Sequence, residues 1–196
     1  MSWIPESVLE DRVVRLEPLR IAHVEALQTA VADGESWKLW YASVPHPDAM
    51  RDYVARAVAG AEQGDVAYAV RALADDKIVG TTRFYRVDAD NKRAKIGYTW
   101  YSASVRRTPV NTACKLLLLS QVFEACQAHA VEFRTHVMNH ASRRAIERLG
   151  AKQDGILRHH QVLPNGTLRD TVVYSIVASE WPTVRCHLRS KLAVDA

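Results

Sequence analysis

Two adjacent arginines, followed by a threonine and a proline, form the most chemically informative segment of the chain. Arg106, Arg107, Thr108 and Pro109 precede an apolar run whose spacing predicts a helix. Threonine is a common N-cap and proline is common in the first helical turn, so we expect the helix to begin here. The next three backbone amides would then have no acceptor within the helix; they belong to Val110, Asn111 and Thr112.

Guanidinium groups beside free helix-start amides suit a multiply charged anion such as a pyrophosphate. A turn of this kind can also cap its helix without binding anything, and these residues alone leave both interpretations open. The surrounding elements favour a ligand. Residues 96–101 alternate like a half-buried strand, with Ile96, Tyr98 and Trp100 on one face. A second strand over 131–138 follows the helix, and such a unit is a right-handed parallel crossover. The helix therefore begins at the carboxyl end of a strand, where open sheets bind ligands.

The rest of the chain predicts an α/β (α+β) fold in one domain over residues 1–196, with about seven strands and flanking helices. We expect further strands over 12–18, 66–73, 77–87, 93–101, 155–163 and 167–177, and helices over 21–31, 47–63, 139–151 and 180–193. Short polar connections make the strands from 66 to 101 consecutive antiparallel hairpins. Pro164, Asn165 and Gly166 predict a tight turn between the last two strands.

Composition narrows the possible classes of function. The chain has 196 residues, 48% hydrophobic residues and a net charge of +4, which is ordinary for a globular protein. No apolar run is long enough to span a membrane, and no dense basic block supports nucleic-acid binding. Three widely separated cysteines predict neither disulfides nor a metal site, so we expect a cytoplasmic protein without a metal.

Other residues have two interpretations each. The aromatic segment 34–45 is expected to pack on the core, with the wall of a substrate pocket as the alternative. Arg169 and Asp170 are expected to form a structural pair, with acceptor recognition as the alternative. His159 and His160 follow Arg158 in an expected strand pair, where a ring that faces solvent has no function and a ring that faces a site could act as a base.

The element order and several motifs resemble the GNAT superfamily of N-acetyltransferases, and within it the branch of ribosomal-protein N-terminal acetyltransferases. The motifs are IGYTWY, RRTPVNTACKLLLLSQVFE, NHASRRAIERLGA, GILRHH, NGTLRDTVVYSI and EWP. The resemblance implies a central mixed, mostly antiparallel sheet that splays between strands 4 and 5. It also implies transfer of an acetyl group from acetyl-CoA to a primary amine, on a protein N-terminus or a small molecule. A homodimer is compatible with it.

The resemblance also implies which residues bind acetyl-CoA. Arg106 matches the first position of the Arg/Gln-x-x-Gly-x-Gly/Ala turn that wraps the CoA pyrophosphate, and Asn111 matches its last. The strand before the turn pairs with pantetheine, and Asn139, which can cap the following helix, contacts CoA. The expected cofactor-binding residues are thus Thr99, Trp100, Tyr101, Arg106, Arg107, Thr108, Val110, Asn111, Thr112 and Asn139. Ser142 matches a serine that protonates the leaving thiolate in the ribosomal-protein branch, although a serine in a short helix is commonly only solvated.

Three positions depart from the family pattern. Pro109 replaces the first glycine of the turn, Lys95 stands where relatives carry a glutamate, and Ile146 stands where many members carry a tyrosine. Two functions are therefore compatible with the chain. It is either an active N-acetyltransferase or a catalytically weak acyl-CoA-binding regulator of the same fold.

Overall fold

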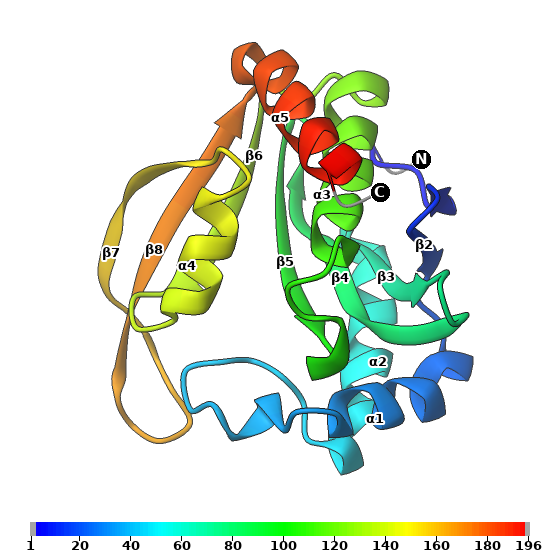
Figure 1. Ribbon diagram of the computed structural model, residues 1–196. Coiled ribbons are helices and arrows are strands. Elements are labelled where there is room, and N and C mark those ends of the chain that lie inside the picture. Colours follow the sequence, from blue (N-terminus) through cyan, green and yellow to red (C-terminus); the bar gives the residue numbers. More distant parts are fainter. Residues whose placement is uncertain (1–2, 195–196) are drawn as a thin grey trace.

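The computed structural model describes residues 3–194, which form one eight-stranded sheet flanked by helices (Figure 1). The strand order is β1-β2-β3-β4-β5-β6-β8-β7. All neighbouring strands are antiparallel except β5 and β6. The strands are β1 (Leu9–Glu10), β2 (Val14–Pro18), β3 (Val66–Ala72), β4 (Lys77–Asp88), β5 (Arg93–Tyr101), β6 (Ala130–His136), β7 (Lys152–Val162) and β8 (Leu168–Val177).

Helices cover both faces of the sheet. They are α1 (Val24–Ala32), α2 (Met50–Ala59), α3 (Val110–Ser120), α4 (His140–Glu147) and α5 (Trp181–Val194). Figure 1 shows α3, α4 and α5 on one face and α1 and α2 on the other. Each face has its own core: Leu118 and Leu188 belong to the first, and Leu27 and Val54 to the second. Apolar spacing in the sequence predicted one buried face each for α1, α2 and α3.

The predicted strands and helices are all present, with small differences at their ends. The sheet has one strand more than the seven expected, because the two-residue strand β1 pairs with β2 through Leu9 and Leu16. Two residues are too few to produce a readable alternation pattern. A π-helical turn, Gln121–Ala125, continues α3, and 3₁₀ turns precede α1 and α2.

The sheet splits between β5 and β6. These are the fourth and fifth strands expected from the sequence, because β1 was not expected, so the split lies where the resemblance implies it. The two strands pair only where Arg93–Lys95 lie beside Ala130–Glu132. Beyond this point β5 stays paired with β4, and β6 stays paired with β8. From Ile96 onward, the edge of β5 that faces β6 therefore has no strand partner. Its backbone N–H and C=O groups can pair with an extended ligand.

A bulge in β5 changes which side chains lie on each face. Tyr98 has a φ of 50°, and the register with β4 shifts between Thr81 and Arg83. As a result, Ile96 packs in the core under α3 and Trp100 packs in the core under α1 and α2. The expectation that Ile96, Tyr98 and Trp100 share one face is therefore wrong, and Tyr98 is 45% exposed. One residue inserted into a strand reverses the alternation after it.

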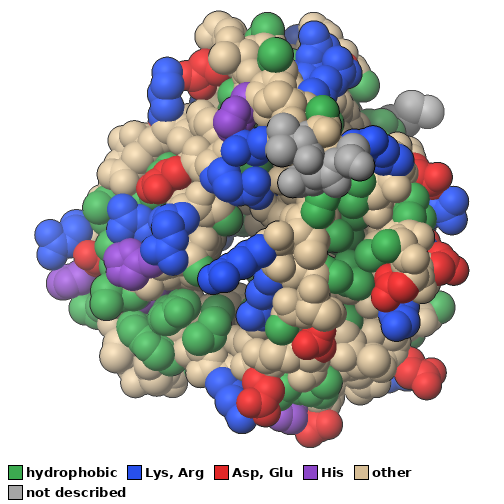
Figure 2. All heavy atoms as spheres, viewed as in Figure 1, with side chains coloured by type: hydrophobic (Ala, Val, Ile, Leu, Met, Phe, Trp, Pro, Cys, Tyr) green, Lys and Arg blue, Asp and Glu red, His purple; other side chains and the backbone are tan. Residues whose placement is uncertain are grey.

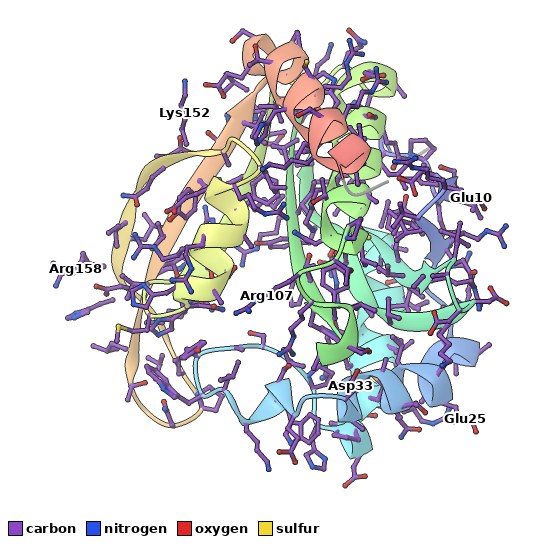
Figure 3. The ribbon with its side chains drawn as sticks, viewed as in Figure 1. Glu10, Glu25, Asp33, Arg107, Lys152 and Arg158 are labelled. Carbon is purple, nitrogen blue, oxygen red and sulfur yellow. The ribbon has the colours of Figure 1, made fainter. Side chains whose placement is uncertain are left out.

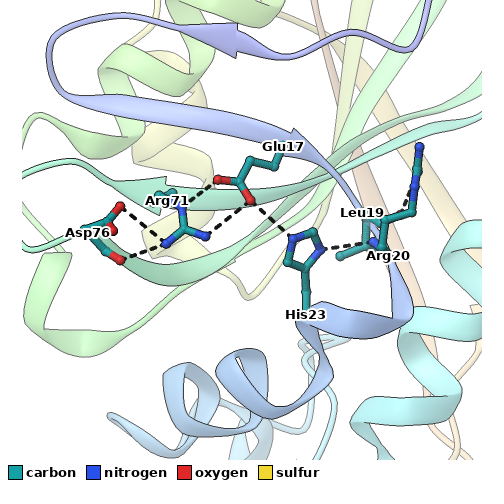
Figure 4. Close-up of polar contacts among 6 residues, drawn as sticks. All are labelled: Glu17, Leu19, Arg20, His23, Arg71 and Asp76. Atoms are coloured by element: carbon teal, nitrogen blue, oxygen red, sulfur yellow. Dashed lines mark hydrogen bonds and ion pairs between the residues drawn. The ribbon is translucent and has the colours of Figure 1, made fainter.

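A polar network connects β2 and β3, which lie near the edge of the sheet away from the split, to the start of α1 (Figure 4). The guanidinium of Arg71 on β3 donates to Glu17 on β2, with Nε 2.5 Å from Oε1. Arg71 also donates to the carbonyl of Asp76, at 2.8 Å. The second oxygen of Glu17 lies 3.3 Å from His23 Nε2. These contacts hold β2, β3 and α1 together, away from the split.

Candidate active site

The split in the sheet opens into a cleft of about 980 Å³. Figure 2 shows a hollow on this face of the molecule with Lys and Arg side chains along its edge. Ten of the eleven residues expected from the sequence line this cleft: Thr99, Trp100, Tyr101, Arg106, Arg107, Thr108, Asn111, Thr112, Asn139 and Ser142. The eleventh, Val110, has a buried side chain that packs in the core.

The start of α3 agrees with the predicted turn, except that Pro109 and not Thr108 occupies the N-cap position. Pro109 has helical backbone angles (φ −59°, ψ −18°), and its carbonyl accepts from the Ala113 amide at 2.9 Å. The hydroxyl of Thr108, which lies outside the helix, accepts from the Val110 amide at 3.4 Å. Asn111 and Thr112 follow it in the first helical turn, where amides lack an intrahelical acceptor.

The two arginines of the turn have different surroundings. One guanidinium nitrogen of Arg106 donates to the hydroxyl of Ser36 and lies 3.4 Å from the carbonyl of Tyr101. Arg106 therefore ties the turn to the loop between α1 and α2. Arg107 has a φ of 62°, is exposed, and lies in the space between β5 and α4 (Figure 3). Its guanidinium is thus available to an anion at the start of α3.

The helix that faces this turn adds two cations that sequence reasoning missed. Arg144 and Arg148 are spaced i, i+4 on α4 and just after it, and both line the cleft. Arg148 also donates to the hydroxyl of Thr112 at 3.1 Å, which joins the ends of α4 and α3. Their spacing in NHASRRAIERLGA was the available signal. Four arginines therefore line this end of the cleft.

The cap of α4 agrees with its prediction. The Oδ1 atom of Asn139 accepts from the Ser142 amide at 3.0 Å. Ser142 is partly buried on the cleft wall, one turn before Ile146. The side chain of Ile146 is buried and cannot carry a proton, so the tyrosine of other superfamily members has no replacement at that position.

A lysine under β5 is a third residue that sequence reasoning missed. Lys115 on α3 is only 5% exposed and lines the cleft. Its ammonium donates to the hydroxyls of Thr99, at 2.8 Å, and Thr82, at 3.2 Å. Within residues 3–194 no carboxylate forms an ion pair with it, and burial lowers the pKa of Lys115 to about 8. A single lysine inside the apolar run ACKLLLL was the signal.

Lys95, which stands where relatives carry a glutamate, forms an ion pair with a glutamate on the neighbouring strand. The Lys95 ammonium lies 3.3 Å from Glu132 on β6, and the guanidinium of Arg134 donates to the same carboxylate oxygen at 2.5 Å. Burial alone would raise the pKa of Glu132, but the bond from Arg134 and the charge of Lys95 hold it below its ordinary value. Glu132 is therefore a stable anion and a weak base.

Part of the aromatic segment 34–45 packs on the core and part lines the cleft, so each of the two interpretations applies to some of its residues. Trp37 packs against the core under α1 and α2, as expected. Tyr41 lines the cleft, and the loop crosses toward β6, where the rings of Trp40 and Tyr41 lie 5.1 and 6.1 Å from the ring of His136. Residues of this loop therefore form a wall of the cleft. Figure 1 shows the loop running from α1 across to the half of the sheet that contains β6.

The expected pair of Arg169 and Asp170 does not form. Asp170 instead pairs with Arg158 at 2.9 Å and accepts from the His159 amide at 2.7 Å. Arg169 lies on the cleft wall, because neighbouring residues of a strand point to opposite faces. His160 also lines the cleft, with Nδ1 3.1 Å from the hydroxyl of Thr171.

No group of three or more metal-binding side chains is found between residues 3 and 194. No helix in the same range is long and apolar enough to cross a bilayer. The site thus combines an open strand edge, a basic helix start and a facing basic helix. The family model described as acetyltransferase (GNAT) domain matches residues 14–152. The chain belongs to the GNAT acetyltransferase family.

Individual relatives agree with this assignment. The protein named "Putative ribosomal N-acetyltransferase YdaF" of Bacillus subtilis (strain 168) is 30% identical over 109 residues, which are 56% of this chain and 58% of YdaF. The structure of a GCN5-related N-acetyltransferase from Brucella melitensis is 29% identical with a TM-score of 0.85, over 95% of this chain and 86% of that chain. Microcin C7 self immunity acetyltransferase MccE, in complex with acetyl-CoA and AMP, shares the fold, with 19% identity and a TM-score of 0.74 over 85% and 93% of the two chains.

Proposed function

We propose that this GNAT acetyltransferase takes its acetyl group from acetyl-CoA and transfers it directly to a primary amine, on a protein N-terminus or a small molecule. One observation carries the proposal. The basic start of α3 lies at the same cleft as the unpaired edge of β5, so one elongated ligand can meet both. Acetyl-CoA has a pyrophosphate at one end of its pantetheine arm and a thioester at the other.

The residues of the cleft fit the parts of acetyl-CoA. Arg107 and the amides of Asn111 and Thr112 would bind the pyrophosphate, and Arg144 and Arg148 would add charge from α4. The free edge of β5 between Thr99 and Tyr101 would pair with the pantetheine amides, and Asn139 would contact CoA from the other wall. The side chain of Trp100 packs in the core, so only its backbone would take part.

Once the two substrates are aligned, direct transfer needs few catalytic groups from the protein. The amine nitrogen forms a bond to the acetyl carbon, the carbon–sulfur bond breaks, and the amine gives up a proton. An α-amino group has a pKa of about 8, so water in the cleft can accept that proton. A backbone amide of β5 would polarise the acetyl carbonyl. The Ser142 hydroxyl, which has no hydrogen-bond partner among the described residues, would give a proton to the thiolate and regain one from water in the cleft.

The proposed acceptor class is supported mainly by the similarity to a named relative. YdaF is named as a ribosomal N-acetyltransferase, and this supports a protein N-terminus as acceptor for the present chain. A protein of this activity would work in the cytoplasm, where ribosomal proteins are made. A homodimer stays a prediction, which light scattering of the purified protein would test.

The test is a screen of amines and peptides with acetyl-CoA, followed by the release of free thiol. Thiol release that needs both the amine and acetyl-CoA supports the transferase. Binding of acetyl-CoA in a calorimeter without turnover of any amine supports instead the acyl-CoA-binding regulator. Lys95, Pro109 and Ile146 suggest this alternative, because they depart from the pattern of the family. Absence of acetyl-CoA binding contradicts both functions.

A further inference from the structure

The cleft passes through the sheet, and side-chain alternation separates what lines its two faces. On β6, Val131 and Phe133 are buried in the core beneath α3, so Glu132 and Arg134 lie on the opposite face. We call the side with α3 and α4 the cofactor face and the opposite side the rear face. An acceptor that meets acetyl-CoA in the split would approach from the rear face.

The neighbouring strands follow the same division. Tyr174 on β8 is buried in the core of the cofactor face, which places Thr171 on the rear face. Arg169 lies there too, because its Nε donates to the Thr171 hydroxyl at 2.9 Å. His160 contacts the same hydroxyl. Three strands thus direct polar side chains toward one rear opening.

This opening is strongly basic. Arg86, Arg134, His160 and Arg169 all line the cleft, and we call them the rear cluster. None of the residues that line the cleft in the described part of the chain is an aspartate or a glutamate. Glu132 neutralises part of the charge, but it is shared between Arg134 and Lys95. Asp65 accepts from the backbone amide of Arg86, not from its guanidinium.

Arg169 is the least compensated member of the rear cluster. Its only hydrogen bond among the described residues is the one from Nε to Thr171, so both terminal nitrogens are without an acceptor. Burial and the charge of Arg134 lower the pKa of Arg169, although two nearby tyrosines act against the shift. A partly buried guanidinium with two free nitrogens presents a fork that matches a carboxylate. Tyr85 and Tyr98 form an aromatic wall beside it, with ring centroids 5.1 Å apart.

We propose that the acceptor is an acidic amine, in which a carboxylate close to the reacting nitrogen binds Arg169 with support from Arg134 and Arg86. This inference rests on the proposed transferase function and specifies its acceptor. The shared chemistry is a primary amine and a carboxylate on one molecule. Its source is an N-terminal peptide with Asp or Glu in the first residues, or a small amino acid with an acidic side chain.

The test compares acceptors that differ only in charge. Two peptide amides would carry Asp or Asn at positions 2 and 3, and the α-amides of glutamate and glutamine, which differ only in the side-chain carboxylate, would form the small-molecule arm. Binding of each would be measured by calorimetry, and kcat/KM by thiol release with acetyl-CoA. The protein would be the wild type, Arg169→Gln and Arg189→Gln. Arg189 on α5 is the matched control, because it is exposed, does not line the cleft and forms no ion pair within residues 3–194.

We expect the Asp peptide, or the α-amide of glutamate, to bind at least about 10-fold more tightly than its neutral twin, which corresponds to one charge-assisted contact. Arg169→Gln should reduce this preference to within about 2-fold, mainly through KM, and Arg189→Gln should preserve it. The peptide and amino-acid arms identify the source. Equal use of charged and neutral acceptors, binding of none of them, or equal effects of both variants overturns the inference.

The two proposals fail in different ways. Thiol release with the Asn peptide at the rate of the Asp peptide leaves the transferase standing and removes the acidic acceptor. A charge preference in calorimetry that Arg169→Gln abolishes, without acetyl-CoA binding or thiol release, leaves the anion site standing and removes the transferase.

Discussion

The ammonium of Lys115 lies 2.8 Å from the hydroxyl of Thr99, directly under the strand that borders the cleft. Thr99 in turn lies 2.8 Å from the hydroxyl of Thr82, so the lysine joins a small network of neutral groups. A buried ammonium without a carboxylate is unfavourable, because hydroxyls do not replace the water it has lost. The fold therefore carries a charge beneath β5 at a cost in stability.

That cost predicts an unusual response to mutation. The pKa of Lys115 is about 8 in the folded protein against an ordinary value of 10.5. Between these pH values the unfolded chain binds more protons, so stability rises with pH through this window. Lys115→Met should raise the free energy of unfolding at pH 7 by up to about 3 kcal/mol. The gain should shrink as the pH rises above 8 and vanish near 10.5.

Urea unfolding at a series of pH values measures this effect, with each variant referred to the wild type at the same pH. Lys95→Met is the matched control, because Lys95 is paired with Glu132 and its loss should destabilise the protein. Destabilisation by Lys115→Met at pH 7, or a difference from wild type that does not change with pH, would contradict the assignment of a buried uncompensated charge.

The turn before α3 predicts different effects for its two arginines. Arg107→Ala should weaken acetyl-CoA binding by about 1–3 kcal/mol, because a charge-assisted contact with phosphate is lost. The loss should be larger at low salt. Arg106→Ala should also weaken binding, but it should in addition loosen the loop of Ser36, because the bond between the two is removed.

Calorimetric titration measures the affinity, and proteolysis of the loop between α1 and α2 separates the two variants. Faster cleavage near Ser36 is expected for Arg106→Ala alone. Wild-type affinity in Arg107→Ala would place the pyrophosphate elsewhere in the cleft.

The network of Glu17 predicts a pH-dependent contribution to stability. The bond from Arg71 is the main cause that lowers the pKa of Glu17, and burial opposes it. A carboxyl group with a lowered pKa stabilises the fold above its ordinary pKa of 4.5, and this stabilisation is lost as the pH falls below it. Glu17→Gln should cost about 1 kcal/mol at pH 7, a modest value because the network is partly exposed. In thermal unfolding, the cost should shrink as the pH falls below 4.5 and disappear once the carboxyl group is protonated in the folded protein. A cost that does not change with pH would assign the effect to packing.

The sequence predicted the elements that create the cleft because their signals are local. Alternation, helical spacing and turn residues are properties of short segments. The split between β5 and β6 was expected from the resemblance to the GNAT superfamily, which these elements and their motifs support. The cap at Asn139 was predictable for the same reason, since Asn139 and the Ser142 amide that donates to it are three residues apart.

The rest depends on contacts between distant segments. Whether Arg169 pairs with Asp170 is decided by Arg158 on the facing strand, which no pattern within β8 reveals. The surroundings of Lys115 come from two other strands, and its bond to Thr99 follows from a bulge at Tyr98 that one inserted residue produces. The positions of functional side chains were therefore less predictable than the positions of the elements that carry them.

Pro109 stands where the turn of its relatives has a glycine, so substitutions at this position test the proposed phosphate binding by the turn. Its backbone angles are already helical, and its carbonyl accepts the first helical hydrogen bond, from Ala113. The proline thus presets the φ of the first turn and lacks an amide that the helix would not have paired.

Pro109→Gly should supply one more N–H group beside Arg107 and at the same time increase the freedom of the unfolded chain. We expect the free energy of unfolding to fall by up to about 1 kcal/mol, because glycine has more unfolded conformations to lose than proline. Affinity for acetyl-CoA should stay the same or improve, because the added amide points out of the helix start toward the anion. Pro109→Ala is the control: it restores the amide with a smaller gain in unfolded-state freedom, so it should bind like Pro109→Gly and be more stable. Calorimetry and thermal unfolding on the three proteins separate the two effects. A loss of affinity in both variants would show that the fixed proline ring, rather than the amides of the turn, organises the phosphate site, and no heat of acetyl-CoA binding from any of the three would contradict the proposed function.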